Sequence, residues 1–211
     1  MIKVKIIPFN PFQVNTYLLF DETGHCAIID AACYGYTEEQ QLKDFINKEK
    51  LTPVVLLNTH CHIDHILGNN FIYAQWKLRP QMHKDGLVFL ENAIESGRAF
   101  GFNVDEPVKP ETFLEEGQSV SFGNQTLKIL EAPGHADGSL CFYHEDAKFV
   151  VAGDVLFHNS IGRTDLPTGD FDTLVNSIHT KLFTLPDEVK VYCGHGSDTT
   201  IGDEKKHNPF V

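Results

Sequence analysis

The stretch NTHCHIDH, Asn58–His65, decides how this chain is interpreted. It places three imidazoles and one carboxylate within six residues, at His60, His62, Asp64 and His65, directly after the apolar run PVVLLN. Residues two apart in an extended backbone project to the same side, so the first two histidines can hold one cation. The aspartate and the third histidine, at the start of the next helix, can serve a second. The intervening Cys61 and Ile63 are expected to point away.

Three further candidates each follow the C-terminal end of a predicted strand. They are His135 after TLKILEAPG, Asp154 after KFVVAG and His195 after VKVYCG. Ligands on loops at one edge of a sheet can converge, whereas the same residues within strands or helices would be scattered. Glycines flank all three, and they permit turns and close approach to an ion; they are Gly134, Gly153, Gly194 and Gly196.

Five imidazoles and two carboxylates suit zinc, with iron or manganese as alternatives. They do not suit calcium or magnesium, which prefer oxygen ligands. The number of candidate ligands fits two divalent metal ions. If Asp154 bridges them, room remains for a shared hydroxide, and such an open position separates catalytic zinc from structural zinc.

The sequence of the first half of the chain predicts strands followed by helices. Alternation in KVKIIPF, VNTYLLF and CAIID predicts a β-meander. The segment TEEQQLKDFINKEK predicts a helix that opens with a capping box, Thr37 with Gln40. PVVLLN predicts a central strand covered on both faces. Further helices are predicted over residues 66–79 and about 85–100.

The second half repeats a strand-rich pattern. SVSF, a Gly-Asn turn, TLKILEAP, SLCFYH and KFVVAG predict strands. A helix behind the cap Asp170 over about 171–183, the strand VKVYC and a short helix before Pro209 complete the chain. A four-layer α/β fold, an αββα sandwich, buries the apolar faces of all these predicted strands and helices. We expect one domain over residues 1–211.

Composition narrows the function classes. The formal net charge of −12 repels polyanions, so we expect no nucleic-acid partner. No stretch approaches the roughly 20 apolar residues of a membrane span, and the N-terminus lacks a signal-peptide pattern. Five cysteines without a CxxC pair fit reduced thiols. We therefore expect a cytoplasmic protein that starts at Met1 and acts on a small molecule.

Together these motifs resemble the metallo-β-lactamase superfamily. HxHxDH at 60–65 is followed by PGH at His135, GD at Asp154 and GH at His195. APGHADGSL, IGRTDLPTGD and the GHGSDTTIG…HNPF ending are most similar to glyoxalase II and its short bacterial relatives. The resemblance implies that Asp154 bridges two metals, one held by His60, His62 and His135 and the other by Asp64, His65 and His195.

The same resemblance implies a hydrolase of a thioester such as S-lactoylglutathione. A metal-bridging hydroxide would attack the carbonyl, so no serine or cysteine nucleophile is needed. Asp64 would be catalytic by orienting the hydroxide and accepting its proton. Two divalent cations, most simply Zn²⁺, would be the cofactors.

Several alternatives stay open. THCHxDH and GRTD also resemble persulfide dioxygenases, which keep a similar ligand set around a single iron. A lactone or ester hydrolase is a further alternative, while Asp154 and the missing signal peptide disfavour a zinc β-lactamase. A scaffold with a dead site ranks last because the ligand set is complete. The substrate-binding residues are unknown. Arg163 is the best-placed cation by sequence, and a structural salt bridge with Asp165 or Asp170 is an equal alternative for it. His158 could line the pocket mouth.

Overall fold

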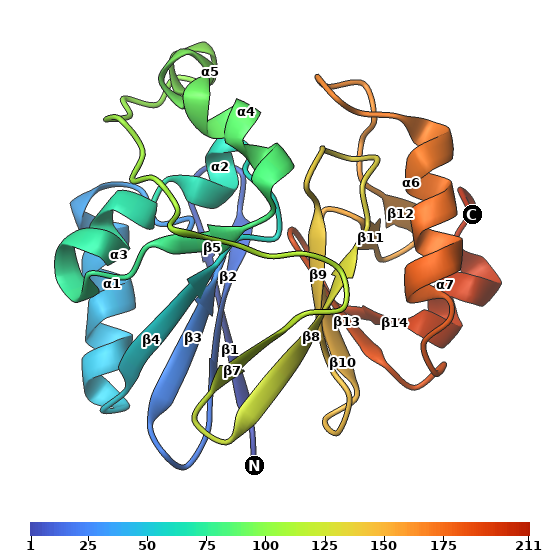
Figure 1. Cartoon of the computed structure of the whole chain (residues 1–211), viewed down its shortest axis with the longest axis horizontal. Coiled ribbons are helices and arrows are strands. Elements are labelled where there is room, and N and C mark those ends of the chain that lie inside the picture. The colour runs from blue at the N-terminus through green and yellow to red at the C-terminus, as the bar shows by residue number, and fades with distance from the viewer.

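The first sheet is built from the N-terminal half of the chain (Figure 1). The computed structural model describes residues 1–211. The strands of this sheet, in spatial order, are β1 (Lys3–Phe9), β2 (Val14–Phe20), β3 (His25–Ile29), β4 (Thr52–Leu57), β5 (Pro80–Met82) and β6 (Thr112–Phe113). β1 to β3 form the predicted antiparallel meander, and β4, β5 and β6 then join in parallel.

The second sheet is built from the C-terminal half. Its strands, in spatial order, are β14 (Thr199–Thr200), β13 (Lys190–Cys193), β10 (Phe149–Gly153), β9 (Leu140–His144), β8 (Gln125–Glu131) and β7 (Ser119–Phe122). The predicted Gly-Asn turn joins β7 and β8, with Gly123 at φ +53°. A small hairpin, β11 (Leu156–Phe157) with β12 (Ser160–Ile161), follows β10.

Helices lie outside both sheets, as predicted. They are α1 (Gly35–Lys48), α2 (Ile63–Ile66), α3 (Asn69–Trp76), α4 (Leu87–Glu91), α5 (Ala93–Ala99), α6 (Phe171–Ser177) and α7 (Ile201–His207). Figure 1 shows α1 and α3 beside the first sheet and α6 and α7 beside the second, with α2, α4 and α5 at one end. The helices are all too short or too polar for a transmembrane segment.

Three buried apolar layers hold this αββα sandwich together. Side chains such as Leu19, Phe142 and Val151 fill the space between the sheets. Leu42 and Ile46 of α1 pack on the outer face of the first sheet with Ile72 of α3. Leu174 of α6 and Ile201 of α7 do the same on the second sheet. Removing this apolar area from water is the main force that stacks the four layers.

Two local predictions in the first half are wrong. The helix over 37–50 begins earlier, at Gly35, and Thr37 with Gln40 makes no capping box. Instead the Glu38 carboxylate in the first turn accepts hydrogen bonds from the backbone N–H groups of Tyr34, at 2.8 Å, and Asn10, at 3.0 Å. β4 is covered on both faces only in its second half, because Val54 is 38% exposed.

Three predicted helices are interrupted. Residues 66–79 divide between α2 and α3, and α3 ends where Lys77 takes a left-handed conformation at φ +60°. Residues 85–100 divide at Asn92, whose side chain donates to the Val88 carbonyl at 2.8 Å. The helix over 171–183 changes after Ser177 into a π-helix, Ile178–Leu182. The break at Asn92 matters for function, since α4 and α5 wall the cavity described below.

Candidate metal centre

The NTHCHIDH segment links β4 to α2 at one edge of the first sheet. His60 and His62 lie in the loop with ring centroids 4.8 Å apart, and Asp64 and His65 lie in α2. The alternate residues Cys61 and Ile63 are buried in an apolar cluster with Ile66, Met82, Leu90 and Ala93, although both also line the cavity described below. The side chains of this segment therefore separate as the sequence predicts.

The second sheet supplies three more side chains at the facing edge. His135 follows β8, Asp154 directly follows β10, and His195 lies just past β13. Gly194 allows this approach, because a Cβ at that position would overlap Oδ1 of Asp154. The structure thus brings all seven candidate side chains together from both sheets.

The first group consists of His60, His62 and His135, whose ligand nitrogens lie within 4.8 Å of one another. The Nε2 atom of each ring is buried and has no hydrogen-bond partner. A buried polar atom without a partner is costly, and three converging imidazole nitrogens match the donor set of a first-row cation. These residues therefore fit a metal ion.

The second group consists of Asp64, His65 and His195, which also lie within 4.8 Å of one another. The Nε2 atoms of the two histidines are 3.3 Å apart. Oδ2 of Asp64 lies 3.5 Å from Nε2 of His195 and 3.8 Å from Nε2 of His65. One carboxylate and two imidazoles pointing at a common position also fit a metal ion.

Asp154 lies between the two groups. Its Oδ2 is 3.5 Å from Nε2 of both His135 and His195, and its Oδ1 is 3.5 Å from Nε2 of His65. Oδ1 is buried and accepts no hydrogen bond. The carboxylate therefore contacts both groups, the position that a bridging ligand requires.

The family follows from a sequence comparison. The model of the metallo-beta-lactamase superfamily matches residues 9–195. The chain belongs to the metallo-β-lactamase superfamily. It is therefore a member of a superfamily of metal-dependent hydrolases, and the fold predicted from the motifs is confirmed.

Individual relatives of this superfamily member cover nearly its whole length. It is 38% identical to a Haemophilus influenzae protein named hydroxyacylglutathione hydrolase GloC, over 99% of this chain and 97% of that one. It superposes on BLEG-1, described as a B3 metallo-beta-lactamase, with a TM-score of 0.89 and 34% identity over 100% and 99% of the two chains. It superposes equally on TTHA1623 in a di-iron-bound form, with a TM-score of 0.88 and 34% identity over 99% and 100%.

Hydrogen bonds outside the two groups orient the imidazoles. Nδ1 of His135 donates to the Arg163 carbonyl and Nδ1 of His195 donates to the Phe12 carbonyl, each at 2.8 Å. Nδ1 of His65 donates to Oδ2 of Asp30 at 3.0 Å. Each bond places the ring proton on Nδ1 and leaves the Nε2 lone pair facing the centre, as metal-binding histidines require.

Asp30 is the site residue that the sequence reasoning missed. It is 1% exposed and also accepts from the Thr59 amide at 2.7 Å and the Thr59 hydroxyl at 2.6 Å. That hydroxyl lies 3.1 Å from Nδ1 of His60. One signal was available, because Asp30 ends the apolar strand CAIID, and β3 pairs in parallel with the strand that precedes NTHCHIDH. A carboxylate at that edge is expected beside the histidines.

Charge separates the two groups of imidazoles. Burial and neighbouring histidines hold the pKa of His60 well below its usual value, and burial lowers the pKa of His62 to about 4. Burial also disfavours protonation of His195, but its contacts with the carboxylates of Asp154 and Asp64, each at 3.5 Å, outweigh burial and raise its pKa to about 9. The carboxylates likewise hold the pKa of His65 well above its usual value against burial. A cation in the second group therefore replaces protons.

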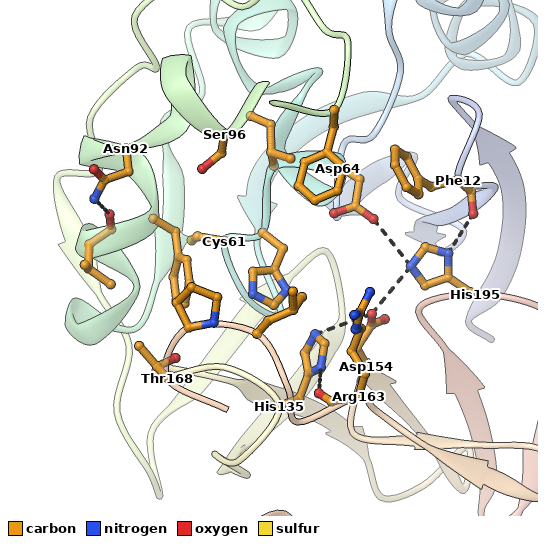
Figure 2. A pocket seen from close by; sticks show the side chains of 17 residues that line it. Phe12, Cys61, Asp64, Asn92, Ser96, His135, Asp154, Arg163, Thr168 and His195 are labelled. Atoms are coloured by element: carbon orange, nitrogen blue, oxygen red, sulfur yellow. Dashed lines mark hydrogen bonds and ion pairs between the residues drawn. The ribbon is translucent and has the colours of Figure 1, made fainter. Parts of the chain in front are cut away.

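A cavity of about 340 Å³ opens beside the centre and is lined by five of the candidate ligands, His62, Asp64, His135, Asp154 and His195. Figure 2 shows His195 between the Phe12 carbonyl and the two carboxylates. Arg163 also lines the cavity, and its predicted salt bridge to Asp165 is present, with two contacts of 2.7 Å. Asp170 caps α6 instead. His158 lines a neighbouring cavity that reaches Asp154 and His195.

Proposed function

We propose that the protein is a dinuclear metal-dependent hydrolase of thioesters such as S-lactoylglutathione. His60, His62 and His135 would hold one cation, Asp64, His65 and His195 would hold the other, and Asp154 would contact both. The observation that carries this proposal is the set of buried, partnerless atoms, Nε2 of three histidines and Oδ1 of Asp154, at the junction of the two groups. The similarity to the protein named hydroxyacylglutathione hydrolase GloC supports the thioester.

The donor set suits zinc, iron or manganese, and we propose zinc. A structure similar to this one, TTHA1623, is described in a di-iron-bound form, which supports two ions and keeps iron as the alternative. Divalent cations at this centre would supply a hydroxide at neutral pH and polarise the substrate carbonyl.

Asp64 is the proposed proton acceptor. Its side chain is 17% exposed and lines the cavity, so one carboxylate can both face the second group and meet a water molecule there. Hydrolysis adds water across the C–S bond: the acyl carbon gains the hydroxyl, the sulfur leaves as a thiolate, and Asp64 takes the proton. A small thiol is a good leaving group, so little acid catalysis is required.

No protein nucleophile is needed. Cys61 is the cysteine in the cavity lining, but it is 1% exposed and burial raises the pKa of its thiol. A thiol kept protonated is a poor nucleophile. The other four cysteines are buried as well.

The test combines metal analysis with three assays on protein purified without chelators. We expect two metal ions per chain and hydrolysis of S-lactoylglutathione that Asp64→Asn reduces about 100-fold. One iron per chain with oxygen uptake on glutathione persulfide would replace this proposal with a dioxygenase. Hydrolysis of a β-lactam with no thioesterase activity would replace it with the activity in the BLEG-1 description, the second candidate that a comparison favours.

A further inference from the structure

We propose that the cavity beside the metal centre prefers thioesters of apolar thiols to thioesters of anionic thiols, so that S-lactoylglutathione is cleaved but is the poorer of the two substrates. This inference rests on the proposed hydrolase function and specifies its substrate class. Its basis is the contrast between the apolar outer wall of the cavity and the single basic side chain of its lining, Arg163, which is already paired with Asp165.

The outer wall gathers apolar side chains from four places in the chain. They are Phe12 before β2, Val88 and Phe89 of α4, Phe100 after α5, and Leu166 with Pro167 before α6. Phe12, Val88 and Phe100 are 42%, 42% and 51% exposed. Single exposed apolar residues are ordinary, but a group that lines one cavity with candidate metal ligands marks a binding site. A cavity of roughly 150 Å³ already holds benzene, so about 340 Å³ holds a larger group.

The wall is ordered around Phe12. Its ring packs edge-on against Phe100, with centroids 5.7 Å apart, and in a tilted arrangement against Phe102 at 5.8 Å. Its backbone carbonyl accepts the hydrogen bond from Nδ1 of His195. Figure 2 shows the Phe12 ring on the cavity side of that carbonyl. The apolar surface is thereby fixed relative to the metal centre, which is what a specificity-determining wall requires.

The cavity offers little to a carboxylate. Arg163 is its single lysine or arginine, and the Asp165 carboxylate engages its Nε and one Nη atom at 2.7 Å. The pair is therefore neutral, and the lining holds no second lysine or arginine. Glutathione carries two carboxylates, and binding them beside this apolar wall would remove them from water without an unpaired basic side chain in return. A neutral aromatic or aliphatic group has no such cost.

The experiment compares two thioesters that share the lactoyl group, one of glutathione and one of benzyl mercaptan. For the metal-loaded wild type we expect kcat/KM to be at least about tenfold higher for the benzyl thioester. Phe100→Ala should reduce that preference about tenfold through KM, and Val88→Ala should reduce it less. Phe210→Ala is the matched control, since Phe210 is 49% exposed and is not among the residues that line the cavity.

A binding measurement separates this inference from the proposed function. The neutral probe N-phenyl-1-naphthylamine should bind wild type about tenfold more tightly than Phe100→Ala, as followed by its fluorescence. Equal or better cleavage of the glutathione thioester, or no effect of Phe100→Ala on either readout, overturns the apolar specificity and leaves the hydrolase proposal intact. Cleavage of neither thioester, with probe binding that depends on Phe100, overturns thioester hydrolysis and leaves the apolar site standing.

Discussion

Replacing Asp30 with asparagine tests how the outer hydrogen bonds control the metal centre. Asp30→Asn keeps the size of the side chain but removes the charge that accepts from His65 at 3.0 Å and twice from Thr59 at 2.7 and 2.6 Å. A hydrogen bond to a charged group contributes about 1.5–3 kcal/mol, which corresponds to roughly a 10- to 150-fold change in an equilibrium constant. We expect the cation of the second group to bind about 30-fold more weakly, within the range of about 10- to 100-fold for such partners.

The assay is a competition titration of metal-free protein with zinc and a chromophoric chelator. Asp21→Asn is the control: Asp21 is also buried and accepts four hydrogen bonds, from Thr23, Asn124 and Gln125, but it lies at the far end of β2. It should lower the free energy of unfolding and leave both metal affinities unchanged. Wild-type affinity in Asp30→Asn, or equal weakening in the control, would show that Asp30 does not act on the metal centre.

Four further predictions concern the centre and the fold. Asp154→Ala should bind at most one tightly held zinc per chain by mass spectrometry and lose at least about 100-fold in kcat, and retention of two ions would rule out the bridge. Protein stripped of metal with a chelator should have a free energy of unfolding about 4 kcal/mol lower than protein at a free metal concentration of roughly 1,000 Kd. Denaturant titration measures this difference, and an unchanged unfolding midpoint would contradict metal binding. Gly194→Ala should lose metal binding, because the added Cβ overlaps Oδ1 of Asp154; full occupancy by elemental analysis would refute this. Asp21→Ala should lower the free energy of unfolding by about 2 kcal/mol at pH 7. Hydrogen bonds from Thr23, Gln125 and Asn124 outweigh burial and lower the pKa of Asp21 in the folded protein, so the difference between the variant and wild type should shrink as the pH falls below about 4. A difference that does not change with pH would refute this assignment.

Much of the fold was predictable because apolar periodicity and buried faces coincide. The meander of β1 to β3, the β7–β8 hairpin and the strand before NTHCHIDH alternate or run apolar in the sequence, and each forms the expected strand. The convergence of the seven candidate side chains was predictable for a related reason. Each lies beyond the C-terminal end of a strand, where ligands converge. The strand ends belong to two facing sheets, and the packing of the sheets brings them together.

The features that escaped prediction depend on tertiary contacts. The helix breaks at Asn92, where the Asn92 side chain donates a hydrogen bond to the Val88 carbonyl. The spacing of apolar residues continues through this position, so the sequence pattern does not indicate the break. β5 and β6 have only three and two residues, and they become strands because β5 pairs with β4 and β6 pairs with β5, not because of local propensity. Asp30 acts on His65 across 35 residues, a contact that only the parallel register of β3 and β4 creates.

Because the candidate ligands are divided between the two sheets, we expect cation binding to come late in folding. His65 and His195 stand 130 residues apart in the chain, and neither sheet carries a complete set of donors by itself. A metal ion acquired there would act as a reversible cross-link that forms only after the halves dock. Metal uptake during refolding should therefore lag behind the formation of secondary structure and report on the completed assembly of the molecule.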